Sequence, residues 1–186
     1  MTIDDYSQLS PDLVIRAVES TGRISDARVM ALNSYENRVY QVGIEDEKPV
    51  IAKFYRPARW QTAQIIEDHH FCQDLVATEL PIVAPLMAQQ STETLFEFEG
   101  YRFSLFQRKG GQAPEAGDLE QIHRLGMLLG RVHAIGKQLD FIARPRLTVE
   151  RFLHVPYQCV REGFMPSSLL ACYDAVITLL SDKIAA

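Results

Sequence analysis

A lysine in the middle of an apolar strand is the first feature of this sequence that could do chemistry. Lys53 lies in residues 49–55 (PVIAKFY), where branched and aromatic side chains predict a β-strand. Its apolar neighbours indicate a strand that is mostly buried on both faces, and a buried ammonium group needs anionic partners to stay charged. A ligand phosphate could be one partner, and the other could be Glu67 or Asp68, which follow 14 and 15 residues later.

Composition by itself favours a simpler alternative, in which Lys53 lies on an exposed face or edge of the sheet with its ammonium group in water. The surrounding elements bear on this choice. They are expected to be a helix over residues 10–22, strands over residues 38–44 and 49–55, a helix over residues 62–78, and a hairpin that turns at Glu99 and Gly100. Together they describe a small lobe with an antiparallel sheet, in which the lysine strand precedes an acidic helix.

The character of the sequence changes after Phe106. Residues 107–117 contain glycine and proline and predict a linker, and residues 118–186 predict helices alone. One helix should have a buried face, because apolar residues recur at spacings of three and four. These residues are Ile122, Leu125, Leu129 and Val132. The predicted fold class is therefore α+β, with a small lobe over residues 1–106 and a helical lobe over residues 118–186.

Composition and charge limit the classes of function. The 186 residues carry a formal charge of −5 and are 47% hydrophobic, which predicts a folded core and argues against a nucleic-acid-binding surface. The three cysteines lack the spacing of a metal site and indicate thiols in a reducing compartment. The acidic amino terminus does not resemble a signal peptide, and the most apolar stretch, SLLACYDAVITLL, is too short to span a bilayer. These features predict a cytoplasmic protein without a membrane segment.

Four short motifs give the chain a resemblance to a known family. They are LNSYENRVYQV, AKFYRPARW, ELPIVAPL and LGRVHAIGK. From about Ser10 onward the chain resembles the stress response kinase A family, a bacterial branch of the aminoglycoside phosphotransferase and choline kinase-like superfamily. The resemblance implies a bilobal, protein-kinase-like fold and a cytoplasmic serine/threonine protein kinase that uses ATP and Mg²⁺ and acts on a protein.

The resemblance also implies a nucleotide site in the small lobe. It assigns Lys53 to the α- and β-phosphates of ATP. The phosphate loop of the family falls on Ser34, Tyr35, Glu36 and Asn37, which lack the glycine-rich pattern of eukaryotic kinases. Backbone amides and the Ser34 and Asn37 side chains would then hold the phosphates. An ordinary Asn/Ser turn is the alternative.

Two features of this implied site stay open. Glu67 has the residue type that such kinases pair with the lysine, whereas Asp68 is in better register with the apolar residues that follow on its helix. The segment after the second hairpin strand would be the hinge, with Leu105 behind the adenine and the backbone of Phe106 and Arg108 binding its edge. A plain linker between the lobes is equally compatible with these residues.

The catalytic loop of this superfamily is not found in the sequence. That loop reads H-G-D-x-x-x-x-N and precedes a metal-binding aspartate, and no H-G-D occurs in the 186 residues. We therefore expect an incomplete helical lobe without catalytic residues or metal ligands, Mg²⁺ ligands in a missing carboxyl-terminal part, and an uncovered apolar surface that favours self-association. A small-molecule kinase of the same superfamily and a non-catalytic nucleotide-binding or interaction module are the alternatives.

Overall fold

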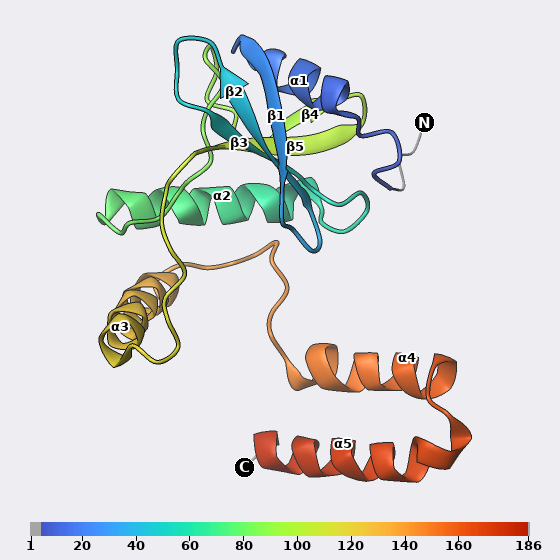
Figure 1. Cartoon of the computed structure of the whole chain (residues 1–186). Coiled ribbons are helices and arrows are strands. Elements are labelled where there is room, and N and C mark those ends of the chain that lie inside the picture. The colour runs from blue at the N-terminus through green and yellow to red at the C-terminus, as the bar shows by residue number, and fades with distance from the viewer. Residues whose placement is uncertain (1–4, 186) are drawn as a thin grey trace. The chain divides into compact units, whose positions relative to one another are not determined.

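The structure is a computed structural model, which describes residues 5–185 (Figure 1). The chain forms two compact units, Met1–Arg144 and Pro145–Ala186. The first unit contains α1 (Pro11–Glu19), β1 (Ser25–Leu32), β2 (Arg38–Ile44), β3 (Val50–Phe54), α2 (Thr62–Ala77), β4 (Phe96–Phe98), β5 (Tyr101–Gln107) and α3 (Leu119–Gly136). The second contains a π-helical turn (Glu150–His154), α4 (Val155–Gly163), a 3-10 turn (Ser167–Leu169) and α5 (Leu170–Ala185).

The five strands form one antiparallel sheet in the order β1-β2-β3-β5-β4. The predicted pairing of β2 with β3 is confirmed, and Val39 lies opposite Lys53 in that pair. The predicted hairpin between β4 and β5 is confirmed as well. Glu99 and Gly100 have φ values of 47° and 82°, and positive values at both positions are what a tight two-residue turn requires. These elements confirm the predicted α+β class.

Strand β1 is not predicted by the sequence. Its residues, SDARVMAL, lack a period-two pattern, and its register with β2 shifts between Ser25 and Val29. Within this irregular stretch Ala27 has a φ of 65°, and the Asp26 carboxylate accepts the backbone N–H of Arg28 at 3.0 Å. Backbone pairing with β2, rather than alternation of side chains, makes this edge segment a strand.

One face of the sheet packs against α1 and forms the hydrophobic core. The predicted first helix is confirmed, and the Ser10 hydroxyl caps it by accepting the backbone N–H of Leu13 at 3.2 Å. The core residues of α1 and the sheet are Leu13, Val14, Ala17, Val18, Val42, Ile44, Val50, Ala52, Phe54, Phe96, Tyr101, Phe103 and Leu105. Alternate residues of each strand point to this face, and their apolar side chains pack against those of α1.

The prediction that the lysine strand is buried on both faces is wrong. In β3 the side chains of Val50, Ala52 and Phe54 are buried, whereas Ile51 and Lys53 are only half-buried. Consecutive side chains of a strand point to opposite faces, so Lys53 lies on the face that α1 does not cover.

Helix α2 packs on this second face, and Figure 1 shows α1 and α2 on opposite sides of the sheet. The predicted helix is confirmed, with Ile65, His69 and Leu75 buried along it. His69 also bonds to the sheet side, since its Nε2 lies 2.8 Å from the Tyr55 hydroxyl and 3.3 Å from the Ser104 hydroxyl. The acidic helix is thus fixed beside the strand that carries Lys53.

Only helices and connecting segments follow Asp118, which caps α3. This confirms the predicted element type, but the expected burial of the apolar face of α3 is wrong. The side chains of Ile122, Leu125 and Leu129 are 42%, 43% and 49% exposed, and no residue of α3 is buried by the rest of the described chain. The sequence spacing therefore predicts the helix correctly but not the covering of its apolar face.

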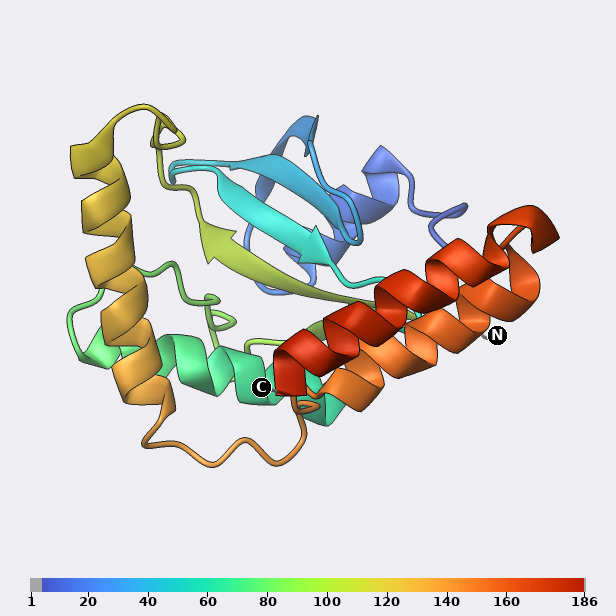
Figure 2. The ribbon, with the colours of Figure 1, turned by 90° about the horizontal axis from the view of Figure 1, so that it is seen from below.

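In the second unit, α4 and α5 run side by side as a helical hairpin (Figures 1 and 2). Asp174 of α5 accepts hydrogen bonds from Arg161 at 3.0 and 3.1 Å and from the Tyr157 hydroxyl at 2.8 Å. The charge that interrupts the apolar run of α5 thus joins the two helices. Within residues 5–185, no helix has both the length and the apolar character needed to cross a bilayer.

Candidate functional site

An apolar cavity includes Lys53 and lies on the sheet face opposite α1, which α2 covers only in part and which we call the open face. It has a volume of about 350 Å³ and is lined by Val39, Ile51, Lys53, Val83, Phe106, Gln107 and Lys109. Strand pairing brings several of these residues together, because Val39 lies opposite Lys53 and Ile51 lies opposite Phe106. The cavity therefore combines an apolar lining with ammonium groups.

Lys53 also lines a second, smaller cavity of about 70 Å³. The other lining residues are Asn37, Tyr55, Trp60, Ile65, Asp68 and Arg144. The Lys53 ammonium lies 4.9 Å from the centre of the Tyr55 ring, within the range of a cation–π interaction. Among residues 5–185 it has no carboxylate within ion-pair distance. In this structure the tyrosine ring, rather than an acid, is the partner of the ammonium group.

The two acidic residues of α2 make different contacts. Asp68 lines the small cavity together with Lys53 and pairs with Arg144 at 3.3 Å. Glu67 instead accepts the backbone N–H groups of residues 142–144, at 2.6, 3.1 and 2.6 Å. Burial raises the pKa of Glu67, but these three bonds outweigh burial and hold the pKa below its usual value. Asp68 is thus the acid that shares a cavity with Lys53.

The residues of the predicted phosphate loop lie in different surroundings. Asn37 lines the small cavity together with Lys53. Tyr35 is fully exposed, and it lines a separate cavity together with Glu36. Ser34 is half-buried and lines neither cavity. Of the four predicted residues, the structure therefore brings only Asn37 to the lysine.

The connector after β3 binds the Glu36 carboxylate. The indole N–H of Trp60 donates to it at 2.9 Å, and the Arg59 guanidinium donates at 3.2 Å. The bond from Trp60 is the main cause that holds the pKa of Glu36 below its usual value. Burial raises this pKa by less than Trp60 lowers it, and the bond from Arg59 lowers it further. Two guanidinium groups also lie near the indole ring, that of Arg144 at 4.5 Å and that of Arg59 at 5.2 Å from the ring centre.

The predicted hinge residues at the end of β5 divide between the two faces of the sheet. Phe106 lines the large cavity, and Arg108 is exposed just beyond the strand. Leu105 is fully buried in the core on the α1 side and is not among the residues that line the cavity. Sequence reasoning did not find Val39 and Ile51, although their period-two relation to Lys53 across β2 and β3 is a signal that could have found them.

A buried histidine is a second feature that the sequence did not indicate. Besides its bonds to Tyr55 and Ser104, His69 places Nδ1 2.8 Å from the Thr94 hydroxyl. Burial lowers the pKa of His69 to about 4, and the nearby Lys53 ammonium contributes in the same direction. No group of three or more His, Cys, Asp or Glu side chains forms a metal site in the described part of the chain.

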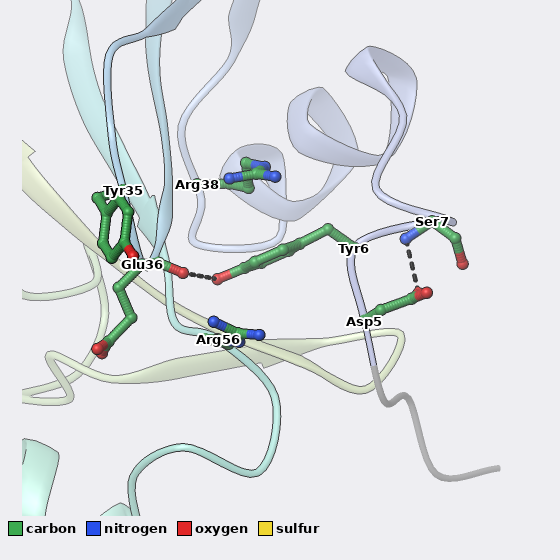
Figure 3. A pocket seen from close by; sticks show the side chains of 7 residues that line it. All are labelled: Asp5, Tyr6, Ser7, Tyr35, Glu36, Arg38 and Arg56. Atoms are coloured by element: carbon green, nitrogen blue, oxygen red, sulfur yellow. Dashed lines mark hydrogen bonds between the residues drawn. The ribbon is translucent and has the colours of Figure 1, made fainter. Parts of the chain in front are cut away.

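A third cavity, of about 500 Å³, does not include Lys53 (Figure 3). Tyr6 lies at its centre, and the Arg38 guanidinium lies 4.9 Å from the centre of the Tyr6 ring. The Tyr6 hydroxyl donates to the backbone carbonyl groups of Glu36 at 3.3 Å and Phe54 at 3.1 Å. Burial raises the pKa of Tyr6 to about 12. The amino-terminal segment thus connects the loop of residues 34–37 with the end of β3.

Comparison with known proteins assigns the chain to a family. Residues 28–163 match the model of the phosphotransferase enzyme family, and the chain belongs to that family. Within it, the chain is 37% identical over 178 residues to the serine/threonine protein kinase RdoA of Salmonella typhimurium, with 95% of this chain and 54% of that protein covered. It is also 37% identical over 169 residues to stress response kinase A of Escherichia coli K12, with 90% and 51% covered.

A solved structure supports the same fold class. The amicoumacin kinase hAmiN, in complex with AMP-PNP, Ca²⁺ and Ami, superposes with a TM-score of 0.67 at 17% identity, over 89% of this chain and 53% of the kinase. The predicted kinase-like fold and the resemblance to stress response kinase A are thereby confirmed. The chain spans about half the length of the curated relatives it matches.

Proposed function

We propose that this chain is the nucleotide-binding part of an ATP-dependent serine/threonine protein kinase similar to stress response kinase A. The observation that carries the proposal is the cavity of about 350 Å³ in which Lys53 and the end of β5 line one apolar space. Membership of a phosphotransferase family supports phosphoryl transfer as the reaction class. A cytoplasmic role in a stress response stays a prediction, and so does the division into lobes at residues 107–117.

The residues of the cavity suit the parts of ATP. Val39, Ile51 and Phe106 offer apolar surface to a flat adenine ring, and backbone groups at the end of β5 can bind its polar edge. The Lys53 ammonium supplies positive charge for the α- and β-phosphates. Asp68 lines the small cavity together with Lys53, so its carboxylate can orient the lysine when the nucleotide is bound.

The catalytic aspartate and the Mg²⁺ ligands belong, in this proposal, to sequence outside these 186 residues, because the relatives are about twice as long. The relatives' names favour a protein serine or threonine as the acceptor. A small-molecule acceptor is the second candidate, because the structural neighbour is described as an amicoumacin kinase. A non-catalytic nucleotide-binding module is the third. Acceptor assays on a full-length protein would distinguish the three.

Titration calorimetry with ATP tests the nucleotide site in the 186-residue chain. Lys53→Met should weaken ATP binding by about tenfold or more, because a hydrogen-bonded charge pair is lost. Lys48→Met is the matched control, since Lys48 is exposed in the turn between β2 and β3 and should not affect binding. Equal affinities of the wild type and Lys53→Met, or no ATP binding by the wild type, would contradict the proposal.

Phosphoryl transfer should not be measurable with the 186-residue chain alone. The groups that orient an acceptor hydroxyl and hold Mg²⁺ in this superfamily are not found in its sequence, and the reaction depends on such positioning and charge stabilisation. Radiolabelled ATP, with a generic protein acceptor and with the chain itself, measures the transfer. Transfer by the purified chain that is lost in Lys53→Ala would show that the catalytic residues lie within it.

Exposed apolar side chains on the helices after Asp118 favour self-association of the chain. The exposed apolar residues on α3 include Leu125 and Leu129, and those toward the end of the chain include Leu169, Val176 and Leu180. We expect the purified chain to form dimers or larger species, since apolar surface of this extent promotes association. Light scattering after gel filtration measures the mass. A monomeric wild type at high concentration would contradict this expectation.

A further inference from the structure

The segment that follows α3, residues 141–144, is held by one face of α2. Glu67 binds three consecutive backbone N–H groups of the segment, and the Gln64 side-chain amide donates to one of its carbonyl groups at 3.1 Å. Phe141 packs edge-on against Phe71, with 5.2 Å between the ring centres. Gln64, Glu67 and Phe71 are spaced by three and four residues, so they lie on the same side of the helix. Backbone, amide and aromatic contacts therefore fix the segment together.

Arg144 extends this contact to Trp60. Its guanidinium pairs with Asp68 at 3.3 Å and lies 4.5 Å from the centre of the Trp60 ring. The indole N–H in turn donates to the Glu36 carboxylate at 2.9 Å. A guanidinium is planar and always charged, so it can bind a carboxylate and stack on an aromatic ring at once, as an ammonium cannot. A continuous series of contacts thus connects α2 with the loop of residues 34–37.

The Arg144–Asp68 pair has little strength if it is considered alone. The two side chains are 32% and 38% exposed, and ion pairs of this exposure contribute about 1 kcal/mol or less. The ring of Trp60 and the three bonds to Glu67 restrict the same short segment, so the contacts hold Arg144 in place jointly. The geometry, rather than the strength of one pair, gives the segment its role.

We propose that residues 141–144 act as a clamp that joins α2 to the loop of residues 34–37, with Arg144 as the positioning residue. The clamp holds Asp68 at the cavity of Lys53 and keeps Glu67 occupied with backbone groups. Its role in phosphate binding rests on the proposed nucleotide function. In that role the clamp sets the loop and Asp68 relative to Lys53 and does not itself touch the nucleotide.

Trp60 is the single tryptophan of the chain, so its fluorescence reports the clamp without any nucleotide. In the 186-residue protein, Arg144→Ala should shift the emission maximum to longer wavelength and raise the acrylamide quenching constant. The ring then loses the nearer of its two guanidinium neighbours and keeps only that of Arg59. Glu67→Gln should change both in the same direction, although Glu67 bonds to the segment and not to the indole. Arg146→Ala is the control, since Arg146 is exposed two residues further on, and it should change neither.

Two fluorescence results would overturn the clamp. A shift in Arg144→Ala without one in Glu67→Gln would show that Arg144 covers the ring only locally. Unchanged emission in both variants would show that the contact does not form. Circular dichroism and urea midpoints check that each variant is folded. Arg144→Lys, which keeps the charge but loses the planar stack, provides a milder variant with an expected intermediate shift.

Nucleotide affinity separates the clamp from the proposed function. In ATP titrations, Arg144→Ala and Glu67→Gln should each weaken binding by about fivefold or more, as expected for coupled elements. Binding that depends on Lys53 but not on Arg144 or Glu67 would overturn the clamp in its binding role and leave the nucleotide site standing. No ATP binding by the wild type would overturn the nucleotide site, and the fluorescence of the ligand-free protein would still decide whether the clamp exists.

Discussion

The two faces of the β-sheet use the same strands in opposite ways. On the α1 face, Ala52, Phe54 and Phe103 are fully buried in a continuous apolar core. On the α2 face, Ile51 and Lys53 are half-buried and line cavities. A step of one residue along β3 therefore separates a core position from a site position, because strand side chains alternate.

This difference shows how a short strand can supply stability and a binding surface together. Close packing on the α1 face fixes the backbone of β3 and β5. The α2 face can then contain cavities while the strands stay fixed. Its buried polar groups are hydrogen-bonded to one another through His69, Tyr55 and Ser104. Among the described residues, no buried side-chain N or O atom lacks a hydrogen-bond partner. Substitutions on the two faces should therefore have separable effects on stability and on binding.

The largest effect on stability should come from a substitution on the α1 face. Phe103→Ala removes a fully buried ring that stacks on Phe54 at 5.1 Å, and should lower the free energy of unfolding by about 3–5 kcal/mol. Urea denaturation measures the loss. Phe106→Ala is the control from the open face of the same strand, where a half-buried ring should cost clearly less. Equal losses at the two positions would remove the distinction between the faces.

The buried histidine of the open face should make stability depend on pH. Burial lowers the pKa of His69 to about 4 in the folded protein, from about 6.5 in an unfolded chain, so the unfolded chain takes up the proton first as the pH falls. Stability should be complete above about pH 6.5 and should fall toward pH 4 by about 2–3 kcal/mol.

Urea midpoints across this pH range test the prediction for His69. His69→Gln should flatten the dependence, whereas His70→Gln, at an exposed position, should not. A pH dependence that is the same in the wild type and His69→Gln would mean that other groups cause it.

A cavity residue of the open face should affect binding more than stability. Ile51→Ala should lower the free energy of unfolding by about 1–2 kcal/mol, since the side chain is only half-buried. It should also weaken ATP binding about threefold or more, because apolar contact with the adenine is lost. Val50→Ala, the buried neighbour, should cost more stability without changing affinity. The opposite ranking in urea and ATP titrations would reverse the assignment of the faces.

The smallest effect should come from the outer surface of α1. Arg16 pairs with Glu99 at 2.8 Å, but the two side chains are 55% and 47% exposed. Arg16→Gln should therefore lower stability by less than about 1 kcal/mol and leave ATP affinity unchanged. Urea denaturation of this variant sets the baseline for the other three comparisons. A loss above about 2 kcal/mol would show that contacts outside the core carry much of the stability.

Much of the fold could be predicted from local patterns. Pro11 and Ser10 predict the start of α1, and Glu99-Gly100 predicts the hairpin, because capping and turn chemistry act over a few residues. Strand β1 could not be predicted, since its pairing with β2 is a non-local backbone contact and its side chains do not alternate. Burial of the α3 stripe could not be judged either, because periodicity shows which residues share a face and not what covers that face.

Less of the candidate site could be predicted. The resemblance implied one nucleotide site for Lys53, Asn37 and Phe106, which stays a prediction. The structure places Lys53 and Phe106 in one cavity and Lys53 and Asn37 in another. Which of Glu67 and Asp68 lies near the lysine could not be decided from helix register. The choice depends on residues 142–144, which come more than 70 residues later and bind Glu67 through backbone groups that have no side-chain signature.

By itself, the sequence determined the α+β class, the antiparallel pairing around Lys53, the acidic helix that follows, and the resemblance to a kinase family. These features depend on local propensity and on motifs within short segments, so they can be read along the chain. Only the tertiary structure decided which face of β3 is open, where Leu105 points, and that Arg144 rather than Lys53 pairs with Asp68. Such facts depend on contacts between distant segments, whose geometry is set by packing and not by spacing in sequence.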